Sequence, residues 1–181
     1  EQLIEKRLIP EYLFENPDFQ LARKKNSIIN WIKGANVSEL YGFSETVKPY
    51  IGDEDFYMNA HNWFRNRYSD LVLKEFMVND EIQASKKIPD ELRGDKEFVE
   101  RLVNGIYYRV VNDLHRTQGQ FGKIDPLIRE PLSDRLLESI ERYRVSDMRS
   151  AFRLANMLSE LYPIYPEKFQ KQYDRVKNMM I

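Results

Sequence analysis

The sequence contains no cysteine, which removes several classes of chemistry. Disulfide frameworks, thiol nucleophiles, cysteine-ligated zinc and iron–sulfur clusters all require that residue. Because disulfides belong to oxidising compartments, we expect an intracellular, cytoplasmic location. Residues 1–7 are mostly polar and lack the apolar segment of a signal peptide. The chain also begins without methionine, so we expect it to be a piece of a longer protein.

Glycine and long apolar runs are also scarce. Only 7 of the 181 residues are glycine, and none stands in a GxGxxG or GxxxxGK[ST] motif. Phosphate-cradling loops of those types are therefore excluded. No run of 18 apolar residues occurs, so the sequence predicts no transmembrane helix and no membrane partner.

The charges nearly cancel. The sequence has 28 Lys and Arg residues against 29 Asp and Glu residues, a formal net charge of −1. This balance excludes a strongly basic, histone-like protein, although a local basic patch is compatible with it. Hydrophobic residues make up 42% of the chain and aromatic residues 13%, which is too apolar for a disordered protein.

Apolar residues recur at helical spacing along almost the whole chain, and two-residue alternation is hard to find. We therefore predict an all-α fold of six to eight helices with no significant sheet. The helices are expected near residues 1–9, 17–33, 36–44, 53–83, 95–118, 133–143, 147–161 and 166–180. We predict one compact domain over residues 1–181, with a seam, if there is one, at the loop 86–94.

Proline and polar residues set the expected helix ends. Asp125 and Pro126 should start a helical turn that Pro131 interrupts, and Ser133 should cap the next helix. The consecutive acids at 53–55 should cap the long helix, because carboxylates are favourable at a helix N-terminus.

The sequence predicts no metal site and no cofactor. Its two histidines, His61 and His115, lack an acidic residue three positions before them, so neither forms an ExxH pair. The acids at 53–55 are consecutive, whereas a calcium loop needs alternating ligands. A dispersed active site is the remaining route to an enzyme, and the sequence gives no local support for it.

Aromatic and basic residues interleave in the segment 57–68. Helical geometry places Trp63 and Arg65 away from the inward band, beside several asparagines. Tryptophan and arginine are common at interaction hot spots, and they also stack on bases and bind phosphates. We select Trp63, Arg65 and Arg67 as binding residues. The alternative is that Trp63 packs against a neighbouring helix.

Arginine dominates the basic residues between positions 93 and 153, where ten arginines accompany two lysines. Many of them can pair with acids along a helix, such as Arg142 with Glu138. Arg109 and Arg116 flank the polar loop 117–120, and we add them to the candidate binding residues. A basic cleft would result if they met Arg65 and Arg67 in the fold.

A second basic cluster lies at residues 23–25, and the segment 27–47 shows weak helix-turn-helix character. Three functional classes therefore remain. We favour a non-catalytic helical interaction or assembly module that binds a protein partner or a copy of itself. A nucleic-acid-binding domain with salt-dependent affinity is the first alternative, and an enzyme with a dispersed site is the second.

Overall fold

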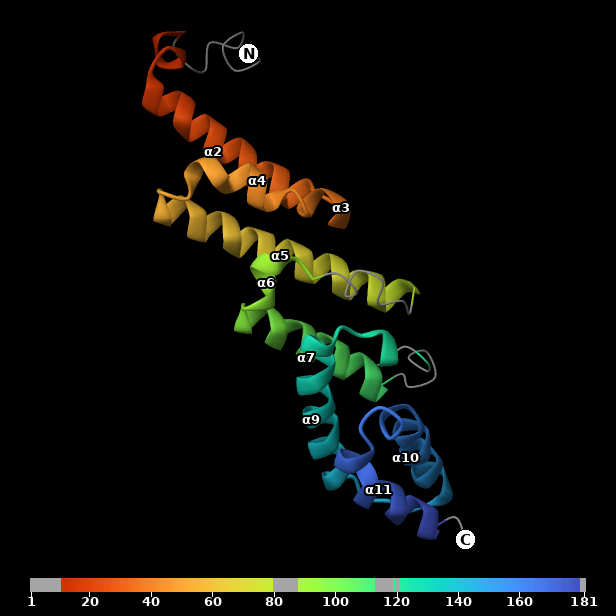
Figure 1. The fold of residues 1–181 in the computed structure, drawn as a ribbon. Helices are drawn as coiled ribbons and strands as arrows, with labels where there is room; N and C mark the ends of the chain where they lie inside the picture. The colour runs from red at the N-terminus through yellow and green to blue at the C-terminus, as the bar shows by residue number, and fades with distance from the viewer. Residues whose placement is uncertain (1–10, 80–87, 113–118, 120, 180–181) are drawn as a thin grey trace. The chain divides into compact units, whose positions relative to one another are not determined.

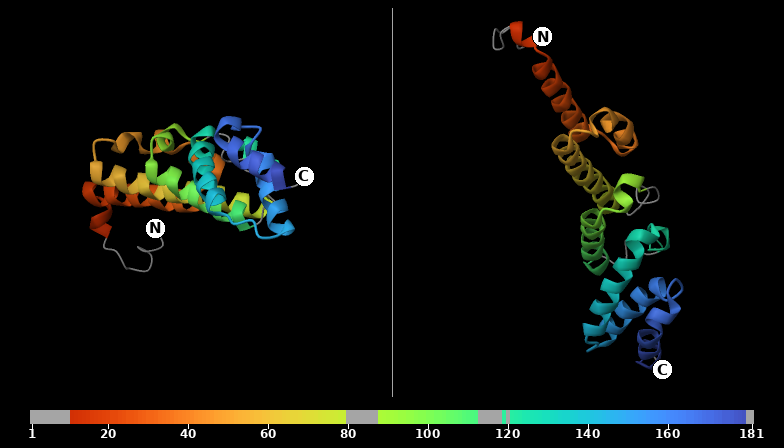
Figure 2. Two further views of the ribbon diagram at one scale, coloured as in Figure 1. Left: turned by 90° about the horizontal axis from the view of Figure 1, so that it is seen from below. Right: turned by 60° about the vertical axis from the view of Figure 1, so that its left-hand side comes forward.

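The computed structural model describes residues 11–79, 88–112, 119 and 121–179 of the chain. Over these residues the backbone forms nine α-helices and three short 3-10 helices, and no strand (Figures 1 and 2). The predicted all-α fold class is confirmed. Six of the nine α-helices have 14 or more residues, and the other three are single turns of four or five residues.

The chain divides into two compact units, one ending at Tyr68 and the other beginning at Ser69. The elements before the division are η1 (Glu11–Phe14), α2 (Pro17–Gly34), α3 (Val37–Leu40), α4 (Phe43–Val47) and η2 (Lys48–Tyr50). The elements after it are α6 (Asp90–Arg93), α7 (Lys96–Asn112), η4 (Phe121–Lys123), α9 (Pro126–Arg142), α10 (Met148–Leu161) and α11 (Pro166–Met179). The longest helix, α5 (Glu54–Asn79), runs across the division and belongs to both units.

Within the expected loop 86–94, the described part contains the single-turn helix α6 and the buried side chains of Ile88 and Leu92. Residues 86 and 87 lie outside the described part of the chain, so a seam at this position stays a prediction, as does the single domain. The expected segment 1–9 and the expected helix ends at 80–83 and 113–118 also lie outside it.

In the first unit, side-chain caps start the two long helices. Asn16 Oδ1 accepts the N–H groups of Asp18 and Phe19 at 2.9 and 3.1 Å, and Pro17 occupies the first turn of α2. Asp53 Oδ1 accepts the N–H of Phe56 at 3.1 Å at the start of α5, which confirms the predicted capping role of the acidic triplet.

A buried stripe follows α5 from end to end. Its members recur every four residues and are all apolar or aromatic: Phe56, Ala60, Phe64, Tyr68, Val72 and Phe76. An α-helix turns by about 100° per residue, so each four-residue step rotates the stripe by about 40° around the helix. Tyr57 is half-buried, and its neighbour Phe56 takes the inward position at the start of the stripe.

Aromatic packing builds the core of the first unit. The Phe43 ring of α4 stacks on the Phe64 ring of α5, with centroids 4.1 Å apart and planes 4° from parallel. The hydroxyls of Tyr41 and Tyr68 lie 3.4 Å apart, within hydrogen-bond distance. Ile32 of α2 is fully buried in the same unit.

In the second unit, α7 packs against α9. Its buried side chains include a four-residue repeat of apolar residues, at Phe98, Leu102, Ile106 and Val110. Asp95 caps this helix by accepting the N–H of Phe98 at 3.0 Å.

The predicted interruption of the next helix at Pro131 is wrong, because α9 continues through that residue from Pro126 to Arg142. Ser133 begins no helix; it is buried within α9 and its hydroxyl donates to the Glu130 carbonyl at 2.7 Å. An interior proline costs a helix about 3 kcal/mol. The inward face of α9 buries Ile128, Leu132, Leu136 and Ile140. Each such side chain contributes about 1.5–3 kcal/mol, so tertiary packing outweighs the local penalty.

Helices α10 and α11 pack as a hairpin at the C-terminal end of the described chain. Asp147 and Ser150 form a reciprocal capping box at the start of α10. The hydrogen bonds from Ser150 hold the pKa of the Asp147 carboxyl below its ordinary range. The Tyr162 and Tyr173 rings stack between the two helices, with centroids 4.2 Å apart.

Gly105 of α7 provides a test of helix packing in the second unit. A Cβ added there would lie 2.5 and 2.9 Å from the two Cδ atoms of Leu73 on α5. Alanine normally stabilises a helix interior by about 1 kcal/mol relative to glycine. We expect Gly105→Ala to lose this gain, because the Leu73 side chain has to move aside for the new methyl group. In a Leu73→Ala background the same change should stabilise the protein by about 1 kcal/mol. Urea denaturation measures both values, and an equal effect in the two backgrounds would contradict the assigned contact.

Asp53 gives a second prediction, through the dependence of stability on pH. Its ion pair with Lys25 and the N–H of Phe56 hold the pKa of the Asp53 carboxyl below its ordinary value of 3.8. The resulting stabilisation is present above the unfolded pKa and is lost as the pH falls through the lower folded pKa. Asp53→Asn keeps a capping acceptor and removes the charge. We expect its Tm to fall less than that of the wild type between neutral and strongly acidic pH; an equal fall would refute the role of the pair.

Candidate interaction surface

The outward side of α5 in the first unit carries an uncharged polar face. Asn59, Asn62 and Asn66 follow one another at three- and four-residue spacing, which places them on one side of the helix. Met58 and Trp63 flank them, with 58% and 39% of their surface exposed. We call these five residues the asparagine face. In a chain in which 31% of residues are charged, a helix side without charge at its centre is distinctive.

Trp63 lies at the edge of the asparagine face, against α2. The ammonium group of Lys33 sits 4.1 Å from the centroid of the Trp63 ring system. A cation over an indole face is attracted by the ring quadrupole, so Lys33 restrains the ring while leaving part of it open to solvent. Trp63 therefore neither points freely into solvent nor packs fully into the core. The predicted position off the inward band is confirmed.

The two arginines next to Trp63 have roles within the protein. Arg67 is half-buried, and its Nε donates to the Ala35 carbonyl at 3.0 Å, just past the end of α2. This hydrogen bond satisfies a helix-end carbonyl that lacks an intrahelical partner. Arg65 is also half-buried and engaged within the protein. Both arginines are less available to a ligand than the sequence suggested.

The other two predicted binding residues fall elsewhere. Arg109 lies on α7 in the second unit, where it is half-buried and engaged within the protein. Arg116 lies outside the described residues. The structure thus brings Trp63, Arg65 and Arg67 together on one helix, and the basic cleft expected to join them to Arg109 and Arg116 stays a prediction.

At least five of the ten described arginines in the second unit form ion pairs or ring contacts. Arg93 pairs with the buried Asp125 at 3.3 Å, and Arg101 pairs with Asp70 at 2.6 Å. The predicted pair of Arg142 with Glu138 is present at 3.8 Å. These contacts agree with the prediction of a surface laced with salt bridges.

His61 lies half-buried among aromatic rings, with the rings of Phe43, Tyr57 and Phe64 each about 6 Å from its imidazole. His115 lies outside the described part of the chain. Within residues 11–79, 88–112, 119 and 121–179, no three His, Asp or Glu side chains gather as a metal site would require. In the same part of the chain, no helix has the length and apolar character needed to cross a bilayer.

The first unit also contains a cavity that the sequence analysis did not predict. It lies along α2 beside η1 and η2, and its basic residues belong to the cluster at 23–25. The weak helix-turn-helix pattern noted over 27–47 forms only the short helices α3 and α4 after α2, of four and five residues. The basic cluster is the sequence feature from which this cavity could have been suspected.

Comparison with known proteins yields no relative. The chain matches no protein-family model, and no curated protein and no solved structure is similar to it. Its function must therefore be argued from its own surfaces.

The contact between Lys33 and Trp63 is testable by fluorescence. Trp31→Phe leaves Trp63 as the single tryptophan. In that background, Lys33→Gln removes the cation, and we expect a red-shifted emission and stronger acrylamide quenching. The loss of stability should be about 0.5–1 kcal/mol, the usual range for an exposed cation–π pair. Lys171→Gln on α11 is the control with the same charge change. Identical quenching in all three proteins would contradict the assigned contact.

Proposed function

We propose that this chain is a non-catalytic helical module that binds a partner protein through the asparagine face of α5, with Trp63 as the anchor. The observation that carries the proposal is a tryptophan that stays 39% exposed on a helix side without charge at its centre. Tryptophan and methionine are enriched in the centres of protein interfaces, whereas lysine and acidic residues are depleted there. A few aromatic residues typically carry most of the binding energy.

The asparagine face supports binding through its polar groups as well. Each exposed asparagine, Asn59 and Asn62, offers two amide donors and a carbonyl acceptor. Such groups can satisfy polar atoms on a partner without the desolvation cost of burying a charge. Lys33 holds the Trp63 ring before binding, which reduces the entropy lost when the side chain is immobilised. A second copy of this chain or another protein is the proposed partner, and no cofactor is needed.

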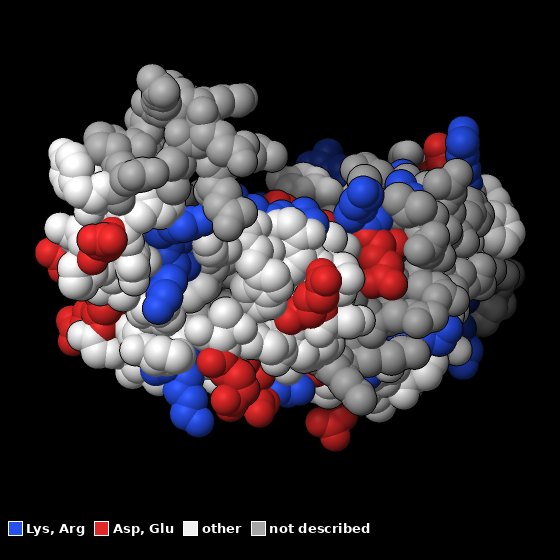
Figure 3. All heavy atoms as spheres, turned by 90° about the horizontal axis from the view of Figure 1, so that it is seen from above, with Lys and Arg blue, Asp and Glu red and all other residues white. Residues whose placement is uncertain are grey.

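The nucleic-acid alternative receives less support. The Nε–H group of Arg67 donates to the Ala35 carbonyl, and Arg65 is also engaged within the protein. On the face drawn in Figure 3, Lys and Arg side chains lie among Asp and Glu side chains. Phosphate-driven binding needs an excess of positive charge along a surface.

The intracellular location expected from the absence of cysteine stays a prediction.

Trp63→Ala tests the proposal. Its matched control is Ile51→Ala, which removes an apolar side chain that is 60% exposed in the same unit but off the asparagine face. Sedimentation over a concentration range first shows whether the wild type self-associates. If it does, we expect Trp63→Ala to weaken association by at least about tenfold, the loss typical of a hot spot, and Ile51→Ala to leave it within about twofold.

If the wild type stays monomeric, the three proteins serve as baits in a quantitative pull-down from cells of the source. Partners retained by the wild type and Ile51→Ala but lost with Trp63→Ala support the proposal. Equal retention by all three refutes the asparagine face as the docking surface. Circular dichroism confirms that each variant is folded. Fluorescence anisotropy with labelled oligonucleotides at two salt concentrations covers the alternative, for which affinity falls steeply with salt.

A further inference from the structure

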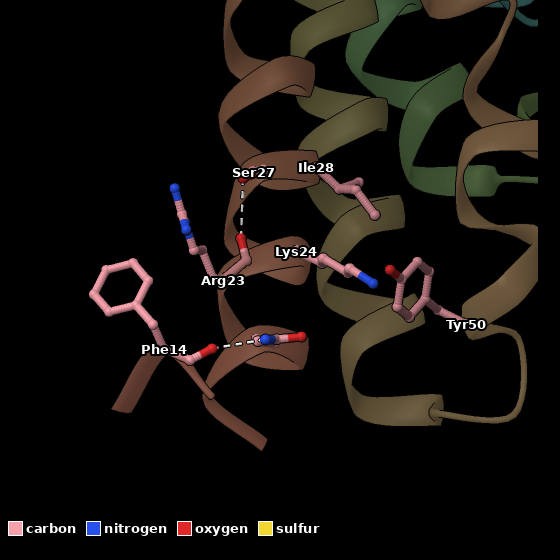
Figure 4. Close-up of a pocket in the computed structure, with 7 residues that line it drawn as sticks. Phe14, Arg23, Lys24, Ser27, Ile28 and Tyr50 are labelled. Atoms are coloured by element: carbon pink, nitrogen blue, oxygen red, sulfur yellow. Dashed lines mark hydrogen bonds between the residues drawn. The ribbon is translucent and has the colours of Figure 1, made fainter. Parts of the chain in front are cut away.

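A cavity on the first unit is separate in its residues from the asparagine face. We call it the α2 pocket; it has a volume of about 530 Å³, and Figure 4 shows its lining: Phe14, Gln20, Arg23, Lys24, Ser27, Ile28 and Tyr50. Cavities that hold small molecules usually measure about 300–1,000 Å³. The α2 pocket therefore has room for a small ligand.

Among the described residues, the lining carries two positive charges and no acidic side chain. Arg23 and Lys24 are its two charged members, and among the described residues neither has a carboxylate partner. The third member of the basic cluster differs, because Lys25 forms an ion pair with Asp53. The sequence as a whole has one more acidic than basic residue. Two cations that line one cavity, with no carboxylate among its described lining residues, therefore stand out from the rest of the chain. An anion is the ligand that would neutralise them.

Contacts within the lining hold it in place. Gln20 Nε2 donates to the Phe14 carbonyl at 2.6 Å and so ties η1 to α2. The Arg23 guanidinium carbon lies 5.3 Å from the centroid of the Phe14 ring, and the Ser27 hydroxyl donates to the Arg23 carbonyl at 3.0 Å. In Figure 4, Arg23 lies beside Phe14, and Lys24 extends towards Tyr50 on the other side of α2.

The pocket combines anion donors with flat apolar surfaces. Arginine offers a planar fork to phosphate oxygens and lysine offers a point charge, and the Tyr50 hydroxyl is a further donor. The rings of Phe14 and Tyr50 offer faces on which a planar group can stack. We propose that the α2 pocket binds a ring-bearing organic phosphate, with the phosphoryl oxygens on Lys24 and the Tyr50 hydroxyl and the ring against an aromatic side chain. Arg23 adds positive charge from the Phe14 side of the pocket.

Three probes separate the two parts of this recognition: phenyl phosphate, inorganic phosphate and benzyl alcohol. Titrations followed by amide NMR report both the affinity and the position of binding. We expect phenyl phosphate to shift the amides of residues 20–28 and 50, and to bind about tenfold more tightly than inorganic phosphate because the ring adds contacts. Benzyl alcohol should bind far more weakly than either. No shift of these amides by phenyl phosphate would overturn the proposal, and so would equal affinity of all three probes.

Charge variants test the assigned residues. Lys24→Gln should weaken the binding of phenyl phosphate by about tenfold, as expected for the loss of a charge-assisted contact. Arg23→Gln removes a charge that lies on the Phe14 side of the pocket, so it should weaken binding by a smaller factor. Lys171→Gln removes one positive charge from α11, outside the pocket, and should leave the affinity unchanged. Both pocket side chains are exposed, so the variants should fold, which amide dispersion verifies. An equal loss with Lys171→Gln would show a general charge effect and refute a built pocket.

Discussion

The apolar stripe on α5 is the constraint on which the rest of the molecule depends. It supplies Phe64 and Tyr68 to the first unit and Val72 and Phe76 to the second, so both cores are assembled on one helix. Burial of four such side chains is worth several kcal/mol, which is comparable to the net stability of a small domain. The same stripe leaves the opposite side of the first half of α5 open, and that is where the asparagine face lies.

Much of the fold follows from local patterns in the sequence. The four-residue repeats predict α5 and α7, and capping side chains such as Asp53, Asp95 and Asp147 set the beginnings of helices. Pro131 shows the limit of this reasoning, because its penalty is local whereas the burial that outweighs it depends on α7, a separate helix. The partner of Arg101 is likewise hidden from local pattern, since Asp70 stands 31 residues away.

The candidate surfaces also combine features that the sequence predicts with features that only the fold shows. The exposure of Trp63 follows from helical geometry, and the neighbouring asparagines are visible in the sequence. The hydrogen bond from Arg67 to the Ala35 carbonyl is not visible in the sequence, because the two residues are 32 positions apart. The α2 pocket was hidden for a related reason. Its basic residues form a visible cluster, but only the fold shows that Asp53 neutralises Lys25 and leaves the other two facing a cavity.

The position of α5 across both units also limits how this protein can change over evolutionary time. A single residue inserted between Phe64 and Tyr68 would turn the following residues of the helix by about 100° and advance them by about 1.5 Å. Tyr68 would then turn away from Tyr41 and from the core of the first unit in which it is now buried. Substitutions that preserve size can be absorbed one at a time, but a change in length cannot. The number of residues in this stretch is therefore expected to vary less among descendants of this sequence than their identity.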